Sequence, residues 1–132
     1  MIVVDSSAMV AALVGLPRDP ALATRLSDDG DLHAPHLLDI EVIDVLGRLV
    51  IGRVISPDRA ADALVDLDDL TIVRYPHPPL APRIWELREN LSAYDAAFVS
   101  LSEALGVPLV TCDGRIGKAP GIRAEIEIYG RA

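Results

Sequence analysis

The sequence predicts an α/β fold in which a parallel sheet of five strands is covered by helices on both faces. Short runs rich in β-branched residues alternate with longer helical patterns along the whole chain, as is typical of parallel strands joined by helical crossovers. The Pro and Gly residues are dispersed as turn punctuation and form no linker. At 132 residues, we expect a single domain over residues 1–132.

Each expected strand is a short apolar run that ends at a turn or a polar residue. The first run stops at Asp5, the third is bounded by Pro76, and the fourth leads into a turn at Asp113 and Gly114. The expected strands cover residues 1–4, 32–34, 71–75, 108–111 and 125–129.

The helical segments have their own start and stop signals. Ser6 or Ser7 is expected to cap the first helix, Pro57 suits the first position of the fourth, and Gly106 ends the sixth. The first helix is expected to end near residue 14, and the others cover residues 21–27, 37–51, 57–67, 80–89 and 94–105.

The composition excludes several classes of protein. A net charge of −8 argues against a basic nucleic-acid groove and against binding to an anionic membrane. The five aromatic residues are too scattered for a base-stacking platform. Cys112 is the only cysteine, which excludes an intramolecular disulfide and favours a cytoplasmic location. The apolar N-terminus is interrupted at Asp5, so we expect no membrane span.

Carboxylates follow two of the expected strands. Asp5 comes directly after the first strand, and Asp113 follows the fourth with one residue between. In open parallel sheets, ligands bind beyond the carboxyl ends of the strands, near the point where the strand order reverses. Asp95 lies in the first turn of an expected helix, where the helix dipole favours an anion, although an ordinary surface acid is equally common there.

The helix expected over residues 37–51 adds another acid. At about 100° per residue, Glu41, Asp44 and Arg48 form a stripe along the edge of its apolar face. Asp44 and Arg48 are expected to form a solvated ion pair across one helical turn. Glu41 lies nearest the core, so its carboxylate needs a partner.

None of these candidate acids has a basic residue directly beside it in the sequence. The set, called the four acids below, is Asp5, Glu41, Asp95 and Asp113. If they converge, a divalent cation can compensate their repulsion, and oxygen-only ligands favour Mg²⁺ or Mn²⁺ over zinc. Such ions activate water and stabilise the departing oxygen in phosphodiester hydrolysis. Neutralising the four acids would leave a net charge of −4, which eases the objection to an anionic substrate.

The segments that carry the four acids resemble the motifs of a known family. They read Met-Ile-Val-Val-Asp-Ser-Ser at 1–7, Ala-Pro-His-Leu-Leu-Asp-Ile-Glu at 34–41, Ser-Ala-Tyr-Asp-Ala-Ala at 92–97 and Pro-Leu-Val-Thr-Cys-Asp at 108–113. In order and spacing they are similar to the four acidic motifs of the PIN domain. The match is closest to its VapC-type branch, the ribonuclease toxins of bacterial type II toxin-antitoxin systems, and it covers essentially the whole chain.

The resemblance implies a fold, an activity and partners. The implied fold is a three-layer α/β/α sandwich, and the implied activity is Mg²⁺-dependent endoribonuclease cleavage of RNA, with Mn²⁺ as a substitute. A homodimer and a cognate antitoxin protein are implied as partners. The antitoxin's helix is expected in an apolar groove between the helix that follows Asp5 and the helix over residues 37–51.

The resemblance also assigns roles to residues. The four acids become the catalytic and metal-binding residues, and Ser7 and Thr111 become hydrogen-bond partners behind them. Asp44 stands where relatives often carry Asn, so it can add a fifth acid. Three other polar residues are candidates for contacts with substrate phosphates because of their positions near Asp95 and Asp113: Arg88, Asn90 and Arg115.

Two other functions are alternatives. A catalytically inactive PIN-like binding module would keep the fold for partner contacts alone. An aspartyl-phosphate phosphohydrolase would use Asp5 as its nucleophile, but it needs a second acid two residues later, where this chain has Ser7. His33, His36 and Cys112 are interpreted as structural residues rather than as metal ligands or a nucleophile.

Overall fold

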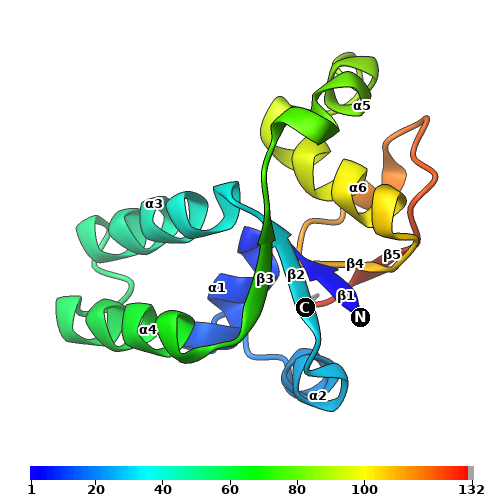
Figure 1. The fold of residues 1–132 in the computed structure, drawn as a ribbon. Coiled ribbons are helices and arrows are strands. Elements are labelled where there is room, and N and C mark those ends of the chain that lie inside the picture. The colour runs from blue at the N-terminus through cyan, green and yellow to red at the C-terminus, as the bar shows by residue number, and fades with distance from the viewer. Residues whose placement is uncertain (131–132) are drawn as a thin grey trace.

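The computed structural model describes residues 1–130 and contains one sheet of five parallel strands (Figure 1). The strands are β1 (Ile2–Val4), β2 (Leu32–Pro35), β3 (Ile72–Tyr75), β4 (Leu109–Thr111) and β5 (Ile126–Ile128). Their order across the sheet is β3-β2-β1-β4-β5. This confirms the predicted α/β class, and each strand bound lies within one residue of its expected place.

Six α-helices connect the strands, as the sequence pattern predicts. They are α1 (Ser6–Val14), α2 (Pro20–Asp29), α3 (Leu37–Ile51), α4 (Pro57–Asp69), α5 (Ala81–Glu86) and α6 (Ala93–Leu105). Short 3₁₀ turns cover Pro78–Leu80 and Ile116–Lys118.

The helix expected over residues 80–89 is shorter than predicted. Its N-terminal side is the Pro-rich 3₁₀ turn, and after Glu86 the backbone tightens. The amide of Arg88 donates to the carbonyl of Trp85, and the amide of Asn90 donates to that of Leu87. These bonds span three residues rather than four, so the chain leaves the α-helical path before Asn90.

The N-cap of α1 also differs from the prediction. Asp5, rather than Ser6 or Ser7, is the capping residue, and its Oδ1 accepts a hydrogen bond from the amide of Ala8 at 2.9 Å. Asp can take this position because its short side chain reaches the free amides of the first helical turn. The acid that ends β1 is therefore fixed by the start of the next helix.

The strand order reverses between the central strand β1 and its neighbour β4. The chain runs outward from β1 through β2 to β3 and then crosses back to β4. Val4 lies opposite Val110 in the parallel register, so Asp5 and Thr111, the next residues of the two strands, also lie side by side. The carboxyl ends of this pair form the crevice where ligands bind in open parallel sheets.

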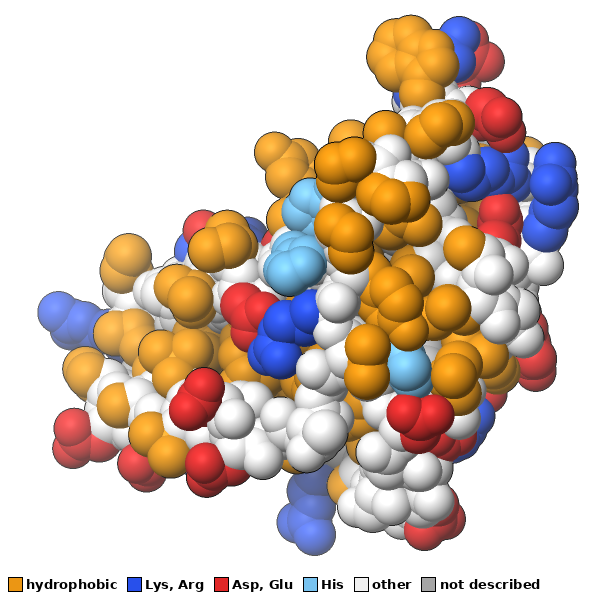
Figure 2. Space-filling view, in the orientation of Figure 1, with side chains coloured by type: hydrophobic (Ala, Val, Ile, Leu, Met, Phe, Trp, Pro, Cys, Tyr) orange, Lys and Arg blue, Asp and Glu red, His pale blue; other side chains and the backbone are white. Residues whose placement is uncertain are grey.

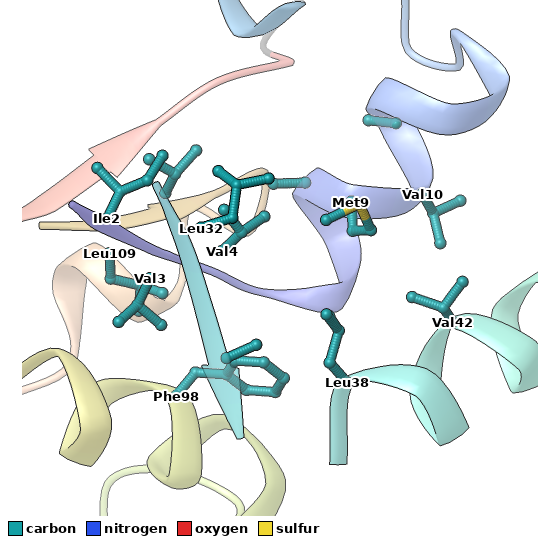
Figure 3. Packing of buried hydrophobic residues seen from close by; sticks show 14 of the residues in the cluster. Ile2, Val3, Val4, Met9, Val10, Leu32, Leu38, Val42, Phe98 and Leu109 are labelled. Carbon is teal, nitrogen blue, oxygen red and sulfur yellow. The ribbon is translucent and has the colours of Figure 1, made fainter. Parts of the chain in front are cut away.

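The core is built from the alternating side chains of the sheet (Figure 3). Ile2 and Val4 lie on one side of β1, and Val3 lies on the other side, which faces Phe98 of α6. Successive residues of a strand point to opposite faces, so a strand buried on both faces must be continuously apolar. The Ile-Val-Val run of β1 meets this requirement, because all three residues are buried.

Helices α3 and α4 lie side by side and extend away from the sheet, to the left in Figure 1. Leu38, Val42 and Leu46 are buried along the inner face of α3, as its periodicity predicts. The outer surface also carries apolar side chains (Figure 2), and Ile40 is 67% exposed. Within residues 1–130, no helix has the length and hydropathy needed to cross a membrane.

Candidate metal-binding site

Asp5 is a buried carboxylate held by three hydrogen bonds. The residue is 4% exposed. Oδ1 accepts from the amide of Ala8 and from the hydroxyl of Ser7 at 2.7 Å, and Oδ2 accepts from the hydroxyl of Thr111. A carboxylate oxygen has two acceptor positions, so Oδ2 retains one for another ligand.

Ser7 and Thr111 join Asp5 to the strand on its far side. The hydroxyl of Ser7 accepts from the amide of Cys112 at 2.9 Å, and the hydroxyl of Thr111 accepts from the amide of Asp113 at 2.9 Å. Both hydroxyls donate to Asp5 at the same time. Hydrogen bonds through these two hydroxyls thus connect the carboxyl ends of β1 and β4 to the Asp5 carboxylate.

Glu41 reaches the same region from α3. The hydroxyl of Ser6 donates to its Oε1 at 3.1 Å. Sequence reasoning considered Ser6 only as a helix cap and missed this contact. The signal is its place directly after Asp5, which brings a second hydroxyl to the carboxyl end of β1.

Asp95 lies at the first turn of α6, where Ser92 is the N-cap. The hydroxyl of Ser92 accepts from the amide of Asp95 at 3.1 Å. The half-buried Asp95 side chain lines a pocket of about 340 Å³ together with Asn90 and Arg115. The N-terminus of α6 thus presents this acid to an open pocket beside the carboxyl end of β4.

The four acids act on one another through their charges. Burial raises the pKa of Asp5, and the charge of Asp95 raises it further, against the hydrogen bonds from Thr111, Ala8 and Ser7. Burial raises the pKa of Glu41, and so do the charges of Asp95 and Asp5. The pKa of Asp95 is raised by burial and then by the charge of Asp113. Such mutual shifts indicate one cluster of like charges.

Asp113 is the exception, because a protein cation already pairs with it. The guanidinium of Arg115 donates to both of its oxygens, at 3.1 and 2.8 Å. These bonds hold the pKa of Asp113 below its usual range. The other three acids form no ion pair within residues 1–130.

The donor set fits a hard divalent ion, but the site is not fully assembled. All the donors are oxygens, and three of the carboxylates form no ion pair within residues 1–130. Nevertheless, among the described residues no three acidic, histidine or cysteine side chains lie close enough to hold one ion together. Asp113 pairs with Arg115 instead.

The other candidate residues divide into near and distant ones. Asn90 lines the pocket of Asp95, and its Nδ2 donates to the carbonyl of Pro120 at 3.0 Å. Arg88 lies outside that pocket and stacks on Trp85, 4.4 Å from the ring centre. Asp44 is 70% exposed and pairs with Arg48 at 3.3 Å, the solvated ion pair that the helical spacing predicts.

The residues interpreted as structural have structural contacts. His33 is buried and bonds to the hydroxyl of Tyr75 and to Asp31, at 2.7 and 2.8 Å. Burial raises the pKa of the Cys112 thiol to about 11. A thiol with such a pKa is almost wholly protonated at neutral pH and is a poor nucleophile.

The expected groove between α1 and α3 is not formed as predicted. The two helices pack directly against each other, and Leu46 is 2% exposed. The apolar pocket that α1 does line, about 250 Å³, lies against α2. The exposed apolar side chains of α3 are on its outer face instead, at Ile40, Ile43 and Ile51.

The sequence matches a family model over most of its length. The model of the PIN domain matches residues 2–122. Ribonuclease VapC12 of Mycobacterium tuberculosis is 39% identical over 97% of this chain and 98% of its own. Ribonuclease VapC1 of the same organism is 43% identical over 96% of each chain.

Solved structures share the fold at lower identity. VapBC2 from Rickettsia felis, crystallised with a DNA fragment from its promoter, superposes with a TM-score of 0.71 at 15% identity, over 98% of this chain and 99% of that one. VapC20 of Mycobacterium tuberculosis superposes with a TM-score of 0.63 at 20% identity, over 92% and 96%. The chain belongs to the PIN-domain family and, within it, to the VapC ribonucleases.

Proposed function

We propose that this protein is a Mg²⁺-dependent endoribonuclease and the toxin of a toxin-antitoxin pair. The observation that carries the proposal is the cluster of Asp5, Glu41 and Asp95, three acids with no ion-pair partner within residues 1–130, at the point where the strand order reverses. The names of the VapC relatives support ribonuclease activity, since identities of 39% and 43% extend over 97% and 96% of this chain.

The four acids would hold the divalent ion, with Mn²⁺ as a substitute for Mg²⁺. The bound metal supplies an activated water and stabilises the leaving oxygen of the phosphodiester. Asp5 is kept in place by Ala8, Ser7 and Thr111, so its free acceptor position points in one fixed direction. Glu41 and Asp95 lie on separate helices and would supply further oxygen ligands.

The pocket beside Asp95 gives the RNA a place to bind. Asn90 and Arg115 line it with Asp95, so an amide and a guanidinium lie next to the proposed scissile phosphate. A guanidinium is suited to phosphate because its planar fork matches two phosphate oxygens. Arg88 stacks on Trp85, outside the pocket of Asp95. Its proposed role is therefore a contact with an RNA phosphate other than the one that is cleaved.

Cleavage of RNA by the purified protein tests the activity. We expect wild-type protein to fragment a single-stranded RNA with Mg²⁺ present, and Asp95→Asn protein prepared in parallel to leave it intact. Fragmentation by both proteins would reveal a contaminating nuclease. Intact RNA with the wild type at every Mg²⁺ concentration, across several RNA sequences, would contradict the proposal.

A cognate antitoxin and a second copy of the chain are the proposed partners. The VapBC2 neighbour is a toxin-antitoxin complex by its title, and α3 and α4 carry exposed apolar side chains, including Ile43 and Val65, suited to an amphipathic helix. Induction of the wild type in a bacterium should arrest growth, and co-expression of the antitoxin should restore it. Light scattering should give twice the monomer mass.

The growth experiment also separates the alternatives. An inactive binding module predicts equal growth with wild type and Asp5→Asn at matched expression. The phosphohydrolase alternative needs Asp5 as an accessible nucleophile, whereas Asp5 is 4% exposed and accepts three hydrogen bonds. We therefore expect no acyl phosphate on Asp5 after incubation with phosphate donors, as measured by mass spectrometry.

A further inference from the structure

Arg115 occupies the acceptor positions of Asp113 that a metal ion would need. Its backbone amide donates to Oδ1 of Asp113 at 2.9 Å, its Nε donates to the same oxygen at 3.1 Å, and its Nη2 donates to Oδ2 at 2.8 Å. Two donors fill the usual capacity of Oδ1, and the third takes half that of Oδ2. One residue thus saturates most of the carboxylate.

No other cation competes for this position in the described part of the chain. Of the ten ion pairs within residues 1–130, only that between Arg115 and Asp113 involves one of the four acids. Arg115 therefore supplies the single positive charge in contact with a cluster that otherwise contains only carboxylates. A positive charge at that place opposes the approach of a divalent cation.

The contact can be released without disturbing the fold. The Arg115 side chain is 88% exposed, and all its hydrogen bonds go to Asp113. Exposed ion pairs contribute little to stability, and solvent can replace the bonds that are lost. The freed guanidinium stays beside the pocket that Arg115 lines with Asn90 and Asp95.

We propose that Arg115 is a latch: it pairs with Asp113 when no ion is bound, and it moves to a phosphate of the RNA when a divalent ion takes Asp113. This inference rests on the metal-dependent function proposed above and adds a coupling to it. Because metal and RNA both favour the released Arg115, each should strengthen the binding of the other. An RNA-free protein should accordingly bind its ion weakly.

The test measures binding rather than turnover, with Arg115→Gln and a matched control. Arg18 is exposed and forms no hydrogen bond or ion pair in the described structure, so Arg18→Gln changes the net charge equally. Mn²⁺ binding without RNA is followed by calorimetry. Binding of a single-stranded RNA oligonucleotide is followed by fluorescence anisotropy with Ca²⁺, which should bind without supporting turnover.

We expect Arg115→Gln to bind Mn²⁺ about two- to fivefold more tightly than wild type, the fold-change that corresponds to an exposed ion pair. Its affinity for RNA should fall, and the slope of log affinity against log salt should decrease by about 1, as for one lost phosphate contact. Arg18→Gln should match the wild type in both. RNA should tighten Ca²⁺ binding in wild type and less so in Arg115→Gln.

Two outcomes would overturn the latch, and they are distinguishable. If wild type binds Mn²⁺ and Arg115→Gln binds it equally or more weakly, Arg115 does not compete with the ion, while the metal-dependent function stands. If wild type binds no divalent ion with or without RNA, the metal dependence itself is wrong and the latch falls with it.

Discussion

Thr111 at the end of β4 donates its hydroxyl hydrogen to Oδ2 of Asp5 at the end of β1. The same hydroxyl accepts from the amide of Asp113, so one side chain positions two of the four acids across the strand pair. Thr111 is fully buried, which removes competing water from both bonds. The positions of Asp5 and Asp113 are therefore fixed by the pairing of β1 and β4 rather than by a loop.

Replacement of this hydroxyl tests its positioning role. Thr111→Val keeps the shape and removes one donor and one acceptor. We expect the cleavage rate to fall about 10- to 100-fold, as when a partner behind a metal ligand is lost, and the free energy of unfolding to fall by about 1–3 kcal/mol. Rate assays and denaturant titrations measure the two effects. Thr24→Val, at an exposed position of α2, is the control and should match wild type in both.

The acids should divide into two groups by their effect on the rate. Asp5→Asn, Glu41→Gln, Asp95→Asn and Asp113→Asn should each slow RNA cleavage by several orders of magnitude, because each removes a proposed metal ligand. The exposed acids Asp28 and Asp69 serve as controls, and their Asn variants should cleave at the wild-type rate. Asp44→Asn should resemble these controls, since Asp44 pairs with Arg48 in solvent. A site variant with full activity would remove that residue from the mechanism.

The melting temperature of the metal-free protein should fall as the pH rises through the raised pKa values of the buried acids. Burial raises the pKa of Asp5, Glu41 and Asp95 in the folded state. The stability these groups contribute is thus present at low pH and is lost as the pH rises through their raised pKa values. In chelator, the melting temperature of wild type should fall over that window, and that of Asp5→Asn should fall less, because Asn keeps the cap acceptor and loses the charge.

The contribution of Asp113 to stability depends on pH in the opposite direction. Arg115 lowers its pKa, so its contribution is present above the ordinary carboxyl range and is lost as the pH falls through the lowered pKa. We expect Asp113→Asn not to raise the melting temperature at neutral pH. Thermal melts of this variant and of Asp5→Asn in chelator check this. A neutral-pH melting temperature of Asp5→Asn far below wild type would show that its hydrogen bonds outweigh its charge.

The sequence is sufficient to predict the helices and strands and the negative charge of the candidate site. Continuous apolar runs specify buried parallel strands, and the strand-end positions of Asp5 and Asp113 follow from the boundaries of those runs. The spacing on α3 correctly separates half-buried Glu41 from exposed Asp44. These predictions succeed because each depends on local periodicity or on an element boundary.

The sequence does not predict which of several possible partners a polar side chain contacts. Asp5 rather than Ser6 caps α1, which leaves the Ser6 hydroxyl for Glu41. Asp113 turns to Arg115, two residues later, and Arg88 turns to Trp85 rather than to the site. Local propensity allows either partner in each case, and only the packed structure decides between them.

Cys112 should be dispensable despite its place beside Asp113. With a thiol pKa of about 11, its thiolate is scarce at neutral pH. We expect iodoacetamide to label it far more slowly than free cysteine, and Cys112→Ala to cleave RNA within about twofold of wild type. Mass spectrometry follows the labelling. Rapid labelling that abolishes cleavage would point to a nucleophilic thiol in place of metal-activated water.

The most direct test of metal-dependent hydrolysis by the four acids is RNA cleavage during removal and return of the ion. We expect wild-type cleavage to stop in excess chelator, to return with Mg²⁺ or Mn²⁺, and not to return with Ca²⁺. Asp95→Asn should stay inactive throughout, which excludes a contaminating nuclease. Cleavage by wild type, but not by Asp95→Asn, that continues unchanged in excess chelator would contradict the account.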